Sequence, residues 1–510
     1  MKVVFFCLVL AAAVHSADMI SEDLTGRIRG PFRLIETALG EVPFFPGAYA
    51  GAHAGDPFIP RYPVSIRIPA GTKPRDVTCD IIWENTGDNV YIPPLPEPTP
   101  LSLIETAEVP NPDPSVYESD AWWPDEPLQL TGTGWKRGSP VAQILLAPFR
   151  WNPSTGELQR ISSIEVTVHT EPAEIRRLGN SDTGDPLRML IVTDLSMQAA
   201  FQELADRRYD QGILTEVVTT DEVYAAASGR DNAEELRNYV KDYYTDNGLD
   251  YLLLGGDTDW VPFRKAYAMT CEAGFEPRED SLPCDLYYSD LDGDWDANGN
   301  GTFGEVEDNI DLYPDVYVGR APVNSLSEAE TFVNNIAAYE DCTQNDFYSR
   351  VLFLAEILWL DPYTNSAESK DLIDEAFLPN FLEITKLYES LGNENIATVM
   401  TALNEGQNFI NHDGHAWYSS LGIGDGYMGY GDVDDINSSG RLAASMYSIG
   451  CWSGAFDYDA IGEHFLVNPD GGSVGYIGNS SYGWGSPGNP CYGYSDALDH
   501  LYHDYLYSDW

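Results

Sequence analysis

The feature that most constrains this chain is a change of rhythm at Met189. From there, short apolar runs alternate with segments of helical length: "MLIVTD", a helical stretch over 197–211, "TEVVTT", "NAEELRNYVKDYYTDNG" and "DYLLLGGD". The runs "DVYVGR" and "RVLFLAEI" continue the series further along. Alternating strands and helices favour a parallel sheet covered on both faces. The sequence therefore predicts an α/β domain over 189–510 with a mainly parallel sheet, and no internal repeat is apparent in it.

The region before this domain has a different pattern. Between 18 and 169 there are few helical periods, and short alternating runs such as "VSIRIPA" and "SIEVTVHT" are separated by proline-rich loops. In the second run Ile164, Val166 and Val168 alternate with polar residues, as on a half-buried strand. The pattern predicts a β-sandwich-like module over 18–169, followed by a polar linker over 170–188.

The N-terminus has the form of a signal peptide over 1–17. Lys2 precedes a 12-residue apolar run, from Val3 to Val14, and small residues follow at plausible cleavage positions. The run is too short to span a membrane, and a buried N-terminal strand is the alternative. No other stretch reaches spanning length. We therefore expect a secreted protein, extracellular or at the cell surface, without a membrane span.

The charge excludes one class of partner. The chain carries 81 acidic against 28 basic residues, a formal net charge of −53, so nucleic acid would be repelled. Such a charge suits high salt or bound divalent cations. Export also permits disulfides, and Cys271 and Cys284, which bracket a loop, could pair.

An acidic loop matches a calcium-binding pattern. The stretch "DWDANGNGTFGEVE" fits D-x-[DN]-x-[DN]-G-x5-E, in which alternate oxygen ligands converge on one ion and glycine permits the sharp turn. The predicted ligands are Asp296, Asn298, Asn300, the Thr302 carbonyl and Glu307, with a second acidic run, Asp290, Asp292 and Asp294, immediately before them. The alternative is a solvated acidic loop. We expect structural Ca²⁺ that stiffens this loop.

Two motifs in the α/β domain carry candidate chemistry. Cys451 follows an apolar run and lies among glycines, where an exposed thiolate would be a nucleophile. His415, 36 residues earlier, also follows an apolar run and could exchange the proton. In a parallel sheet both would lie at the carboxyl edge, where ligands bind. The alternatives are a small buried cysteine and, for His412 with His415, a fragment of a metal site.

Over 186–510 the sequence resembles the gingipain-type cysteine peptidases of family C25, relatives of caspases and legumain. The resemblance rests on "YLLLGGDTDWVP", "CDLYYSDLDGDWD", "PDVYVGRAPVNSLSEAE", "NHDGHA", "GCWSGAFDYDAIGEHF" and "GGSVGYIGNSSYGWG", in that order. It implies a caspase–hemoglobinase-like sheet with His415 and Cys451 as the catalytic dyad. It also implies that the N-terminal module resembles the family's pro-segment, which covers the active site until it is cleaved.

The resemblance extends to the substrate pocket. Asp285 matches a family aspartate near the primary specificity pocket, which would favour a basic side chain in the substrate, and Trp484 matches an aromatic at the pocket wall. Ala416, whose amide would help to bind the oxyanion, stands where the family usually has glycine. The resemblance implies a further strand with a Gly-Asp-Pro motif after Trp510, so the chain is either a fragment of a longer protein or lacks that edge strand.

The sequence therefore predicts a secreted, calcium-stabilised cysteine endopeptidase that acts on protein or peptide substrates. It would be made as a zymogen bound by its own pro-segment and activated by cleavage after Arg176, Arg177 or Arg188. No third catalytic residue can be assigned, although Asp257 and Asp259 lie on the correct edge. The alternatives are a calcium-dependent surface binding or adhesion protein with a degenerate site and a carbohydrate-active hydrolase with two carboxylates.

Overall fold

A computed structural model describes residues 19–28, 32–50, 53–102, 111–136, 139–173, 186–271, 278–310, 312–424 and 426–507. The predicted signal peptide and positions 174–185 of the predicted linker lie outside these residues, and so do Arg176 and Arg177. None of the described helices is long and apolar enough to cross a membrane.

The N-terminal β module, residues 19–173, consists mainly of two antiparallel sheets. One contains β1 (Met19–Asp23), β10 (Glu157–Pro172), β5 (Thr72–Gly87) and β9 (Phe149–Asn152), and the other β4 (Tyr62–Arg67), β8 (Ser139–Leu146) and β7 (Leu128–Lys136). Their inward side chains form one core, in which Ile144 and Leu146 meet the alternating Ile164, Val166 and Val168. A hairpin, β2 (Arg33–Thr37) with β3 (Gly40–Phe44), and a short helix, α1 (Pro114–Tyr117), complete the module.

The first α/β unit is a parallel sheet of four strands in the order β12-β11-β13-β16. Alternate side chains of the central strands point to opposite faces: Leu190 and Val192 enter one core, and Ile191 enters the other. Helices therefore cover both faces. The strands are β11 (Arg188–Thr193), β12 (Leu214–Thr219), β13 (Tyr251–Gly255) and β16 (Tyr317–Ala321), and the helices are α2 (Gln198–Asp210), α3 (Thr220–Ala226), α4 (Asn232–Asn247) and α5 (Leu326–Glu340).

The second α/β unit is a parallel sheet of five strands in the order β20-β17-β21-β25-β26. Its buried faces again alternate, since Leu352 and Leu354 enter one core while Val351 and Phe353 enter the other. The strands are β17 (Arg350–Ala355), β20 (Glu383–Tyr388), β21 (Phe409–Asp413), β25 (Ser445–Ser448) and β26 (Tyr476–Gly478), and the helices are α6 (Ala367–Ala376), α7 (Ile396–Asn404), α8 (Tyr430–Asp434), α9 (Ile461–Val467) and α10 (Tyr494–Tyr507).

The α/β region thus has parallel, doubly covered sheets as predicted, but two of them rather than one. In each sheet the second strand along the chain lies on one side of the first, and the later strands follow in order on the other side. The two sheets therefore share one strand order. The structure therefore contains an internal repeat of topology that is not apparent in the sequence. Helices α5 and α9 join the units, because the Asn335 side chain of α5 donates to the carbonyls of Leu466 (3.1 Å) and Asn468 (3.0 Å).

Short antiparallel ribbons extend from these sheets. They are β14 (Arg264–Cys271) with β15 (Arg278–Cys284), β18 (Ile357–Leu360) with β19 (Tyr363–Asn365), and β22 (Ala416–Trp417), β23 (Ser420–Ile423) and β24 (Gly426–Gly429). The first ribbon excludes the predicted disulfide. Cys284 lies opposite Arg264 and Cys271 opposite Arg278, at the two ends of the ribbon. Seven residues of strand span roughly 23 Å, whereas bridged cysteines have Cα atoms within about 7 Å.

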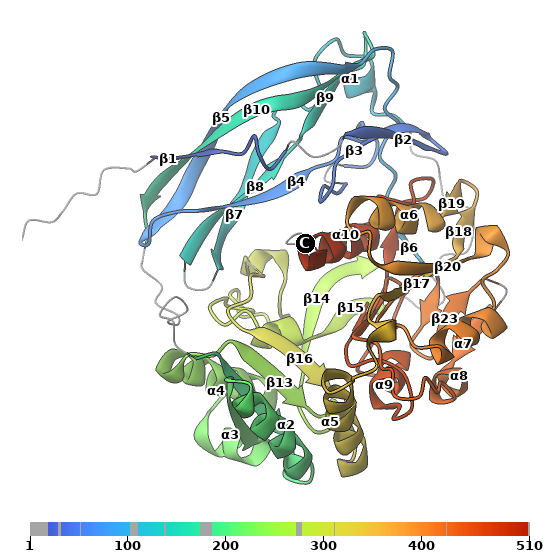
Figure 1. Cartoon of the computed structure of the whole chain (residues 1–510). Helices are drawn as coiled ribbons and strands as arrows, with labels where there is room; N and C mark the ends of the chain where they lie inside the picture. The colour runs from blue at the N-terminus through green and yellow to red at the C-terminus, as the bar shows by residue number, and fades with distance from the viewer. Residues whose placement is uncertain are drawn as a thin grey trace, which may run out of the picture.

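The N-terminal β module packs against the second α/β unit. Figure 1 shows the module, coloured blue to cyan, at one end of the molecule, with α10 beneath it. Tyr492 enters the core of the module, where its ring meets Phe58 (centroids 4.8 Å apart) and its hydroxyl donates to the Pro43 carbonyl (3.0 Å). A single strand, β6 (Thr99–Pro100), leaves the module and pairs with β27 (Trp484–Gly485) of the α/β region.

Candidate active site

The two predicted motifs meet at the carboxyl edge of the five-stranded sheet. His415 lies two residues beyond β21 and Cys451 three residues beyond β25, and these strands are parallel neighbours. The connecting loops touch: a methyl group added to Gly450 would lie 2.4 Å from the Ala416 Cβ and 3.0 Å from the Gly414 carbonyl oxygen. Only glycine fits there. The sheet topology therefore brings together two residues that lie 36 positions apart.

Cys451 is completely buried. The Gly483 amide donates to its sulfur (3.2 Å), and its thiol faces the Gly483 carbonyl (3.7 Å). Burial raises the pKa of the thiol to about 12, although the amides of Gly483, Ser102 and Leu101 oppose this shift. The sulfur is therefore a neutral thiol in this state, and a neutral thiol is a poor nucleophile.

The residue after Cys451 adopts an uncommon backbone conformation. Trp452 has φ of 64°, in the left-handed region that a bulky side chain rarely occupies, and its indole is buried. Its amide donates to the Ser481 carbonyl (2.6 Å), which holds the turn. Strain of this kind costs on the order of 1–3 kcal/mol and persists where the surroundings fix the turn. Here it fixes the direction in which the chain leaves Cys451.

Both ring nitrogens of His415 are engaged by carbonyl oxygens. Nδ1 faces the carbonyl of Leu101 in a short contact, and Nε2 faces the carbonyl of Leu358 at 3.2 Å. The imidazole is thus directed toward peptide carbonyls rather than toward the sulfur of Cys451. In this state the candidate base cannot take the thiol proton directly.

The chain that covers both residues comes from the N-terminal β module. We call Thr99–Ser102 the blocking segment. Its strand β6 pairs antiparallel with β27, and the Leu101 amide donates to the Gly483 carbonyl (2.8 Å). Leu101 is fully buried, contacts His415 through its carbonyl and packs in the same core cluster as Cys451. One residue of the module therefore reaches both members of the predicted dyad.

Glu356 is a site residue that the sequence analysis missed. It follows β17, and its Oε2 accepts a hydrogen bond from the His415 amide at 2.7 Å. Burial raises the pKa of its carboxyl to about 8, although the hydrogen bond from His415 opposes that shift. A methyl group on Gly414 or Gly422 would lie 2.6 Å or 2.2 Å from the same oxygen. The available signal was an acidic residue directly after the apolar run "RVLFLA".

His412 has a structural role. It is fully buried, with Nδ1 2.9 Å from the Ser448 hydroxyl and Nε2 2.8 Å from the Gly422 carbonyl. Burial lowers the pKa of its imidazole to about 4, so the ring is neutral at ordinary pH. It links the ends of β21 and β25. This arrangement separates His412 from the proton-exchange role predicted for His415.

A buried ion network lies next to the site. The Lys370 ammonium contacts Asp499 (2.5 Å) and Asp413 (3.4 Å), and all three side chains are fully buried. Burial alone would raise the pKa of Asp499, but Lys370 outweighs it and holds that pKa well below its usual range. Asn411 donates to the same carboxylate (2.9 Å). The network fixes α6, α10 and the end of β21 around one charge.

The three residues predicted at the substrate pocket lie in different elements and have different contacts. Asp285 forms a two-point ion pair with Arg320 (2.7 and 2.8 Å), which also donates to the Gly256 carbonyl (2.9 Å). Its carboxylate is therefore paired within the protein, and its role at the substrate pocket stays a prediction. Trp484 lies in β27 beside the blocking segment, and Ala416 lies in β22 against Gly450.

The weak candidates for a third catalytic residue lie on the first α/β unit. Asp257 follows β13, where it accepts hydrogen bonds from the Thr258 amide (2.6 Å) and the Asn324 side chain (3.1 Å). Asp259 lies in the turn beyond it. Both sit on the edge that belongs to the other sheet, whereas Glu356 sits on the edge that carries His415.

The side chains predicted to bind calcium form hydrogen bonds within the acidic loop, and Glu305 takes part in them in place of Glu307. Asp296 accepts a hydrogen bond from the Gly301 amide (2.9 Å), and Asn298 and Asn300 donate to Glu305 (3.0 and 2.6 Å). Glu307 is exposed. Asp296 also pairs with Arg230, and Thr302 donates its amide to Asn300 (2.7 Å). The carboxylate that meets the two asparagines therefore belongs to Glu305, not to Glu307.

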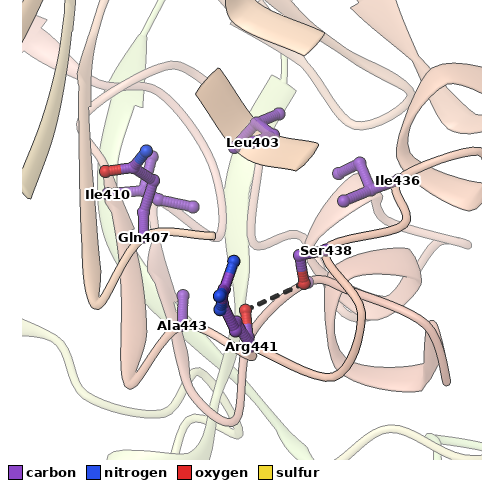
Figure 2. Close-up of a pocket in the computed structure, with 8 residues that line it drawn as sticks. Leu403, Gln407, Ile410, Ile436, Ser438, Arg441 and Ala443 are labelled. Carbon is purple, nitrogen blue, oxygen red and sulfur yellow. Dashed lines mark hydrogen bonds between the residues drawn. The ribbon is translucent and has the colours of Figure 1, made fainter. Parts of the chain in front are cut away.

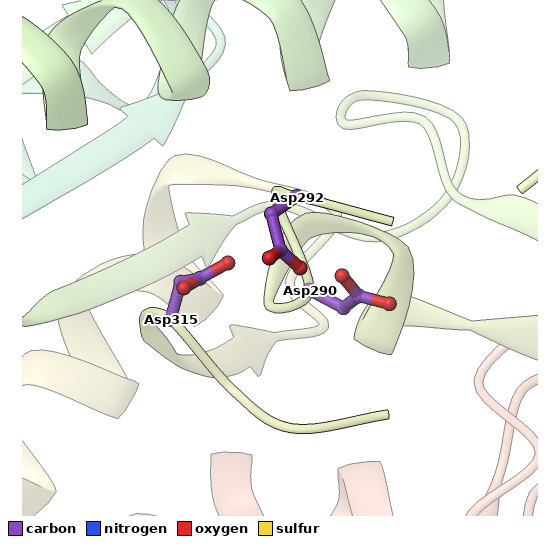
Figure 3. A group of neighbouring side chains, drawn as sticks. All are labelled: Asp290, Asp292 and Asp315. Atoms are coloured by element: carbon purple, nitrogen blue, oxygen red, sulfur yellow. The ribbon is translucent and has the colours of Figure 1, made fainter. Parts of the chain in front are cut away.

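A second acidic cluster lies beside this loop. One carboxylate oxygen from each of Asp290, Asp292 and Asp315 lies within 4.8 Å of the others, and Figure 3 shows them converging. Asp290 is 1% exposed, and its Oδ2 accepts no hydrogen bond from the described residues. Burial raises the pKa of Asp290 to about 6, and Asp292 adds to that shift. Three converging carboxylates, one of which has a buried oxygen that accepts no hydrogen bond from the described residues, fit a hard divalent cation.

Two cavities among the described residues lie away from the dyad. A space of about 10 Å³ between Leu403, Gln407 and Arg441 (Figure 2) is large enough for about one water molecule. A larger hollow of about 320 Å³ is lined by Met189, Tyr251 and Tyr317 of the first unit. Neither is lined by His415 or Cys451. The space at the dyad is instead filled by the blocking segment.

Comparison with known proteins identifies a family for the α/β region. The model of peptidase family C25 matches residues 182–509. No curated protein matches the chain. A solved structure named only as a protease is 20% identical, with a TM-score of 0.47, over 59% of this chain and 62% of that one.

Two further solved structures are similar to the chain. The arginine-specific cysteine proteinase gingipain R is 17% identical, with a TM-score of 0.49, over 66% of this chain and 70% of that one. The complex of pro- and mature domains of RgpB from Porphyromonas gingivalis is 19% identical, with a TM-score of 0.46, over 59% and 66%.

Proposed function

Because the chain belongs to peptidase family C25, we propose that it is a cysteine endopeptidase held latent by its own N-terminal β module. Cys451 is the nucleophile, and His415 is its general base and acid. The observation that carries the proposal is the position of Leu101, whose carbonyl contacts His415 and which packs in one buried cluster with Cys451. A protein that bound ligands without catalysis would have no need to cover a thiol and an imidazole together.

The chemistry follows from the two side chains. His415 takes the thiol proton of Cys451, and the thiolate attacks the substrate carbonyl carbon. The backbone amides of Cys451 and Ala416 stabilise the negative charge on the oxygen. His415 then donates the proton to the leaving amine, the C–N bond breaks, and a thioester remains. Water, deprotonated by His415, hydrolyses the thioester and restores the thiol. Glu356 holds the His415 backbone while this occurs.

Latency is supported by the state of the thiol. While the blocking segment is in place, Cys451 is fully buried and the pKa of its thiol is about 12. Cleavage of the linker, with Arg176, Arg177 and Arg188 as candidate sites, would let the module leave. Water and the imidazole would then reach the sulfur, and its pKa would fall. The chain is proposed to act outside the cell, where the predicted signal peptide directs it.

A thiol probe tests the dyad. The full chain, intact or cleaved in its linker, is treated with an iodoacetamide probe, and the labelled cysteine is found by mass spectrometry. We expect labelling of Cys451 only after cleavage, with loss of peptidase activity in Cys451→Ala and His415→Ala. Cys342→Ala, a change at a half-buried thiol, is the matched control and should keep activity. An active Cys451→Ala variant would refute the proposal, and an unreactive cleaved chain would favour a degenerate binding protein.

We also propose structural Ca²⁺ at the acidic loop. The ligands are the predicted Asp296, Asn298, Asn300 and Thr302, with Glu305 in the position expected of Glu307, and the neighbouring Asp290, Asp292 and Asp315. The unsatisfied Asp290 oxygen and the short separations in the cluster support this proposal. No step of the reaction passes through the ion, which would join β16 to the loop after η1 (Asp285–Tyr288).

Calorimetry with CaCl₂ alone tests the ion. The chain should bind calcium and gain a few degrees in melting temperature, since a ligand bound only by the folded state stabilises it. Asp315→Asn should weaken binding, while Asp246→Asn, an exposed change on α4, should not. Absence of heat and an unchanged melting temperature after chelation would contradict the proposal.

A further inference from the structure

We infer that the pocket filled by Leu101 is the primary specificity pocket of the peptidase, and that it selects a leucine-like aliphatic side chain on the amino side of the cleaved bond. This inference rests on the proposed function, and it replaces the basic residue expected from Asp285. It concerns the substrate and not only the latent state, because the blocking segment lies in the site as an extended peptide.

The position of the blocking segment identifies which peptide bond faces the nucleophile. The Gly483 amide donates to the Cys451 sulfur (3.2 Å), the Leu101 amide donates to the Gly483 carbonyl (2.8 Å), and the Leu101 carbonyl contacts Nδ1 of His415. The carbonyl that lies at the candidate base is therefore that of Leu101. The peptide bond at the dyad is Leu101–Ser102, and Leu101 is the residue on its amino side.

The backbone pairing is of the kind that a substrate could reproduce. β6 adds to β27 as an antiparallel strand, and the Leu101 amide donates to the Gly483 carbonyl at 2.8 Å. Addition of a peptide to an exposed strand supplies affinity through main-chain hydrogen bonds and specificity through the pockets beside them. A substrate that adds to β27 in the same register would place its own side chain where that of Leu101 now lies.

The pocket is built by two glycines and an indole. Methyl groups added to Gly483 and Gly485 would lie 2.9 Å from Cδ1 and Cδ2 of Leu101, and the one on Gly485 would also lie 2.6 Å from the Trp359 ring. Leu101 is fully buried and Trp359 is 2% exposed. The missing side chains therefore make the room that a branched aliphatic side chain occupies, and the indole closes it.

The charges around the pocket do not suit a basic side chain. The core cluster that contains Leu101 consists of apolar and aromatic side chains together with Cys451. Asp285 is already paired with Arg320. Asp496 lies on the Gly493 side of Gly485, and its two buried oxygens accept no hydrogen bond from the described residues. Burial raises the pKa of this carboxyl well above its usual range, so it is neutral in this state. A guanidinium or ammonium in the pocket would lose its hydration and would meet a neutral carboxyl rather than an ionised one.

The same contacts account for the survival of the Leu101–Ser102 bond. The Leu101 carbonyl oxygen is directed to Nδ1 of His415 instead of to the amides proposed for the oxyanion. In this orientation His415 is held and the oxygen has no stabilising site for a developing charge. The segment therefore fills the pocket as a substrate would but does not present its carbonyl for attack.

The experiment uses the full chain after linker cleavage and peptides that differ only in the residue before the scissile bond. Leucine and methionine peptides should be cleaved with kcat/KM on the order of 100-fold above arginine and lysine peptides, because a charged group is disfavoured in an apolar pocket. Faster cleavage of arginine or lysine peptides would overturn the inference. The Cys451 probe reports the dyad separately, so a labelled enzyme with basic preference would refute the pocket alone. Absence of both labelling and hydrolysis would refute the proposed function.

One enzyme variant and one pair of synthetic peptides test whether this pocket sets the preference for leucine. Gly485→Ala should lower the ratio of leucine to alanine cleavage about tenfold, because its methyl group enters the space of Cδ2. Since that change also crowds Trp359, synthetic 97–104 peptides provide a measurement on the unaltered enzyme. The natural sequence should inhibit, and the version with Leu101→Arg should inhibit at least about tenfold less. Equal or stronger inhibition by the arginine peptide would contradict the inference.

Discussion

The two α/β units share a strand order but differ in what happens at their carboxyl edges. In the four-stranded unit the polar side chains pair with one another, Asp285 with Arg320 and Asp257 with Asn324. In the five-stranded unit the His415 ring contacts the carbonyl of Leu101, a residue from another part of the chain that packs in one core cluster with Cys451. The same strand order therefore forms a carboxyl edge in both units. That edge is a candidate active site in the five-stranded unit, where the segment that covers its polar side chains can be removed.

The largest expected effect separates the two edges directly. Cys451→Ala or His415→Ala should lower the peptidase activity of the cleaved chain by about 10⁴-fold or more, as removal of a nucleophile or its base does in other enzymes. Asp257→Ala, at the equivalent edge of the first unit, should change kcat/KM by less than about tenfold. The measurement is peptide hydrolysis at saturating and limiting substrate. A comparable loss in Asp257→Ala would remove the distinction between the units.

The next effect is on stability. Lys370→Met leaves Asp499 and Asp413 buried without their cation, which should cost about 3–5 kcal/mol of unfolding free energy. Lys386→Met removes partly exposed ion pairs with Asp371 and Asp374 and should cost less than about 1 kcal/mol. Urea denaturation followed by tryptophan fluorescence measures both. Equal costs would show that the network near the site contributes no more than a surface ion pair.

A smaller effect is expected on latency. Leu101→Asp places a carboxylate in an apolar pocket and should release the blocking segment, so the intact chain should label at Cys451 about tenfold or more faster. Leu391→Asp changes a leucine that is 65% exposed and should leave the labelling rate unaltered. If Leu101→Asp stayed as unreactive as the parent chain, latency would have to be assigned to contacts other than the segment.

The smallest effect concerns pH. The carboxyl of Glu356 has a pKa of about 8 in the folded chain against 4.5 for an ordinary glutamate. The folded state therefore retains a proton that the unfolded state has lost, and this group's contribution to stability falls as the pH rises from about 4.5 to 8. Glu356→Gln should make the melting temperature fall less between pH 5 and pH 8 than in the parent chain. Glu383→Gln, an exposed change, should reproduce the parent slope.

Local patterns predicted the elements but not their long-range pairing. The alternation of apolar strands and helices located the parallel strands, and the polar residues after two of them located His415 and Cys451 at one edge. The same alternation cannot say that β16 and β17, which follow one another in sequence, belong to different sheets. The pairing considered for Cys271 and Cys284 is wrong for a related reason: β15 pairs antiparallel with β14 and carries Cys284 to the opposite end of the ribbon from Cys271.

Local sequence patterns also could not predict which segment covers the candidate active site. Leu101 lies in the proline-rich stretch "IPPLPEPTPLSL", which has the composition of a loop, and its partner Gly483 is more than 380 positions away. A strand of two residues has no periodicity to detect. Glu356 could have been singled out as an acid after an apolar run, but its approach to the His415 amide depends on the neighbouring order of β17 and β21.

The shortness of β6 has a consequence for how the protein would be switched on. Two paired residues bind weakly by themselves, so the blocking segment stays in place because the N-terminal β module holds it at high effective concentration. Cutting the linker turns that intramolecular contact into an association between two chains. Activity of the cut protein would then depend on dilution: concentrated samples remain inhibited by their own released module, and the same samples become active as they disperse.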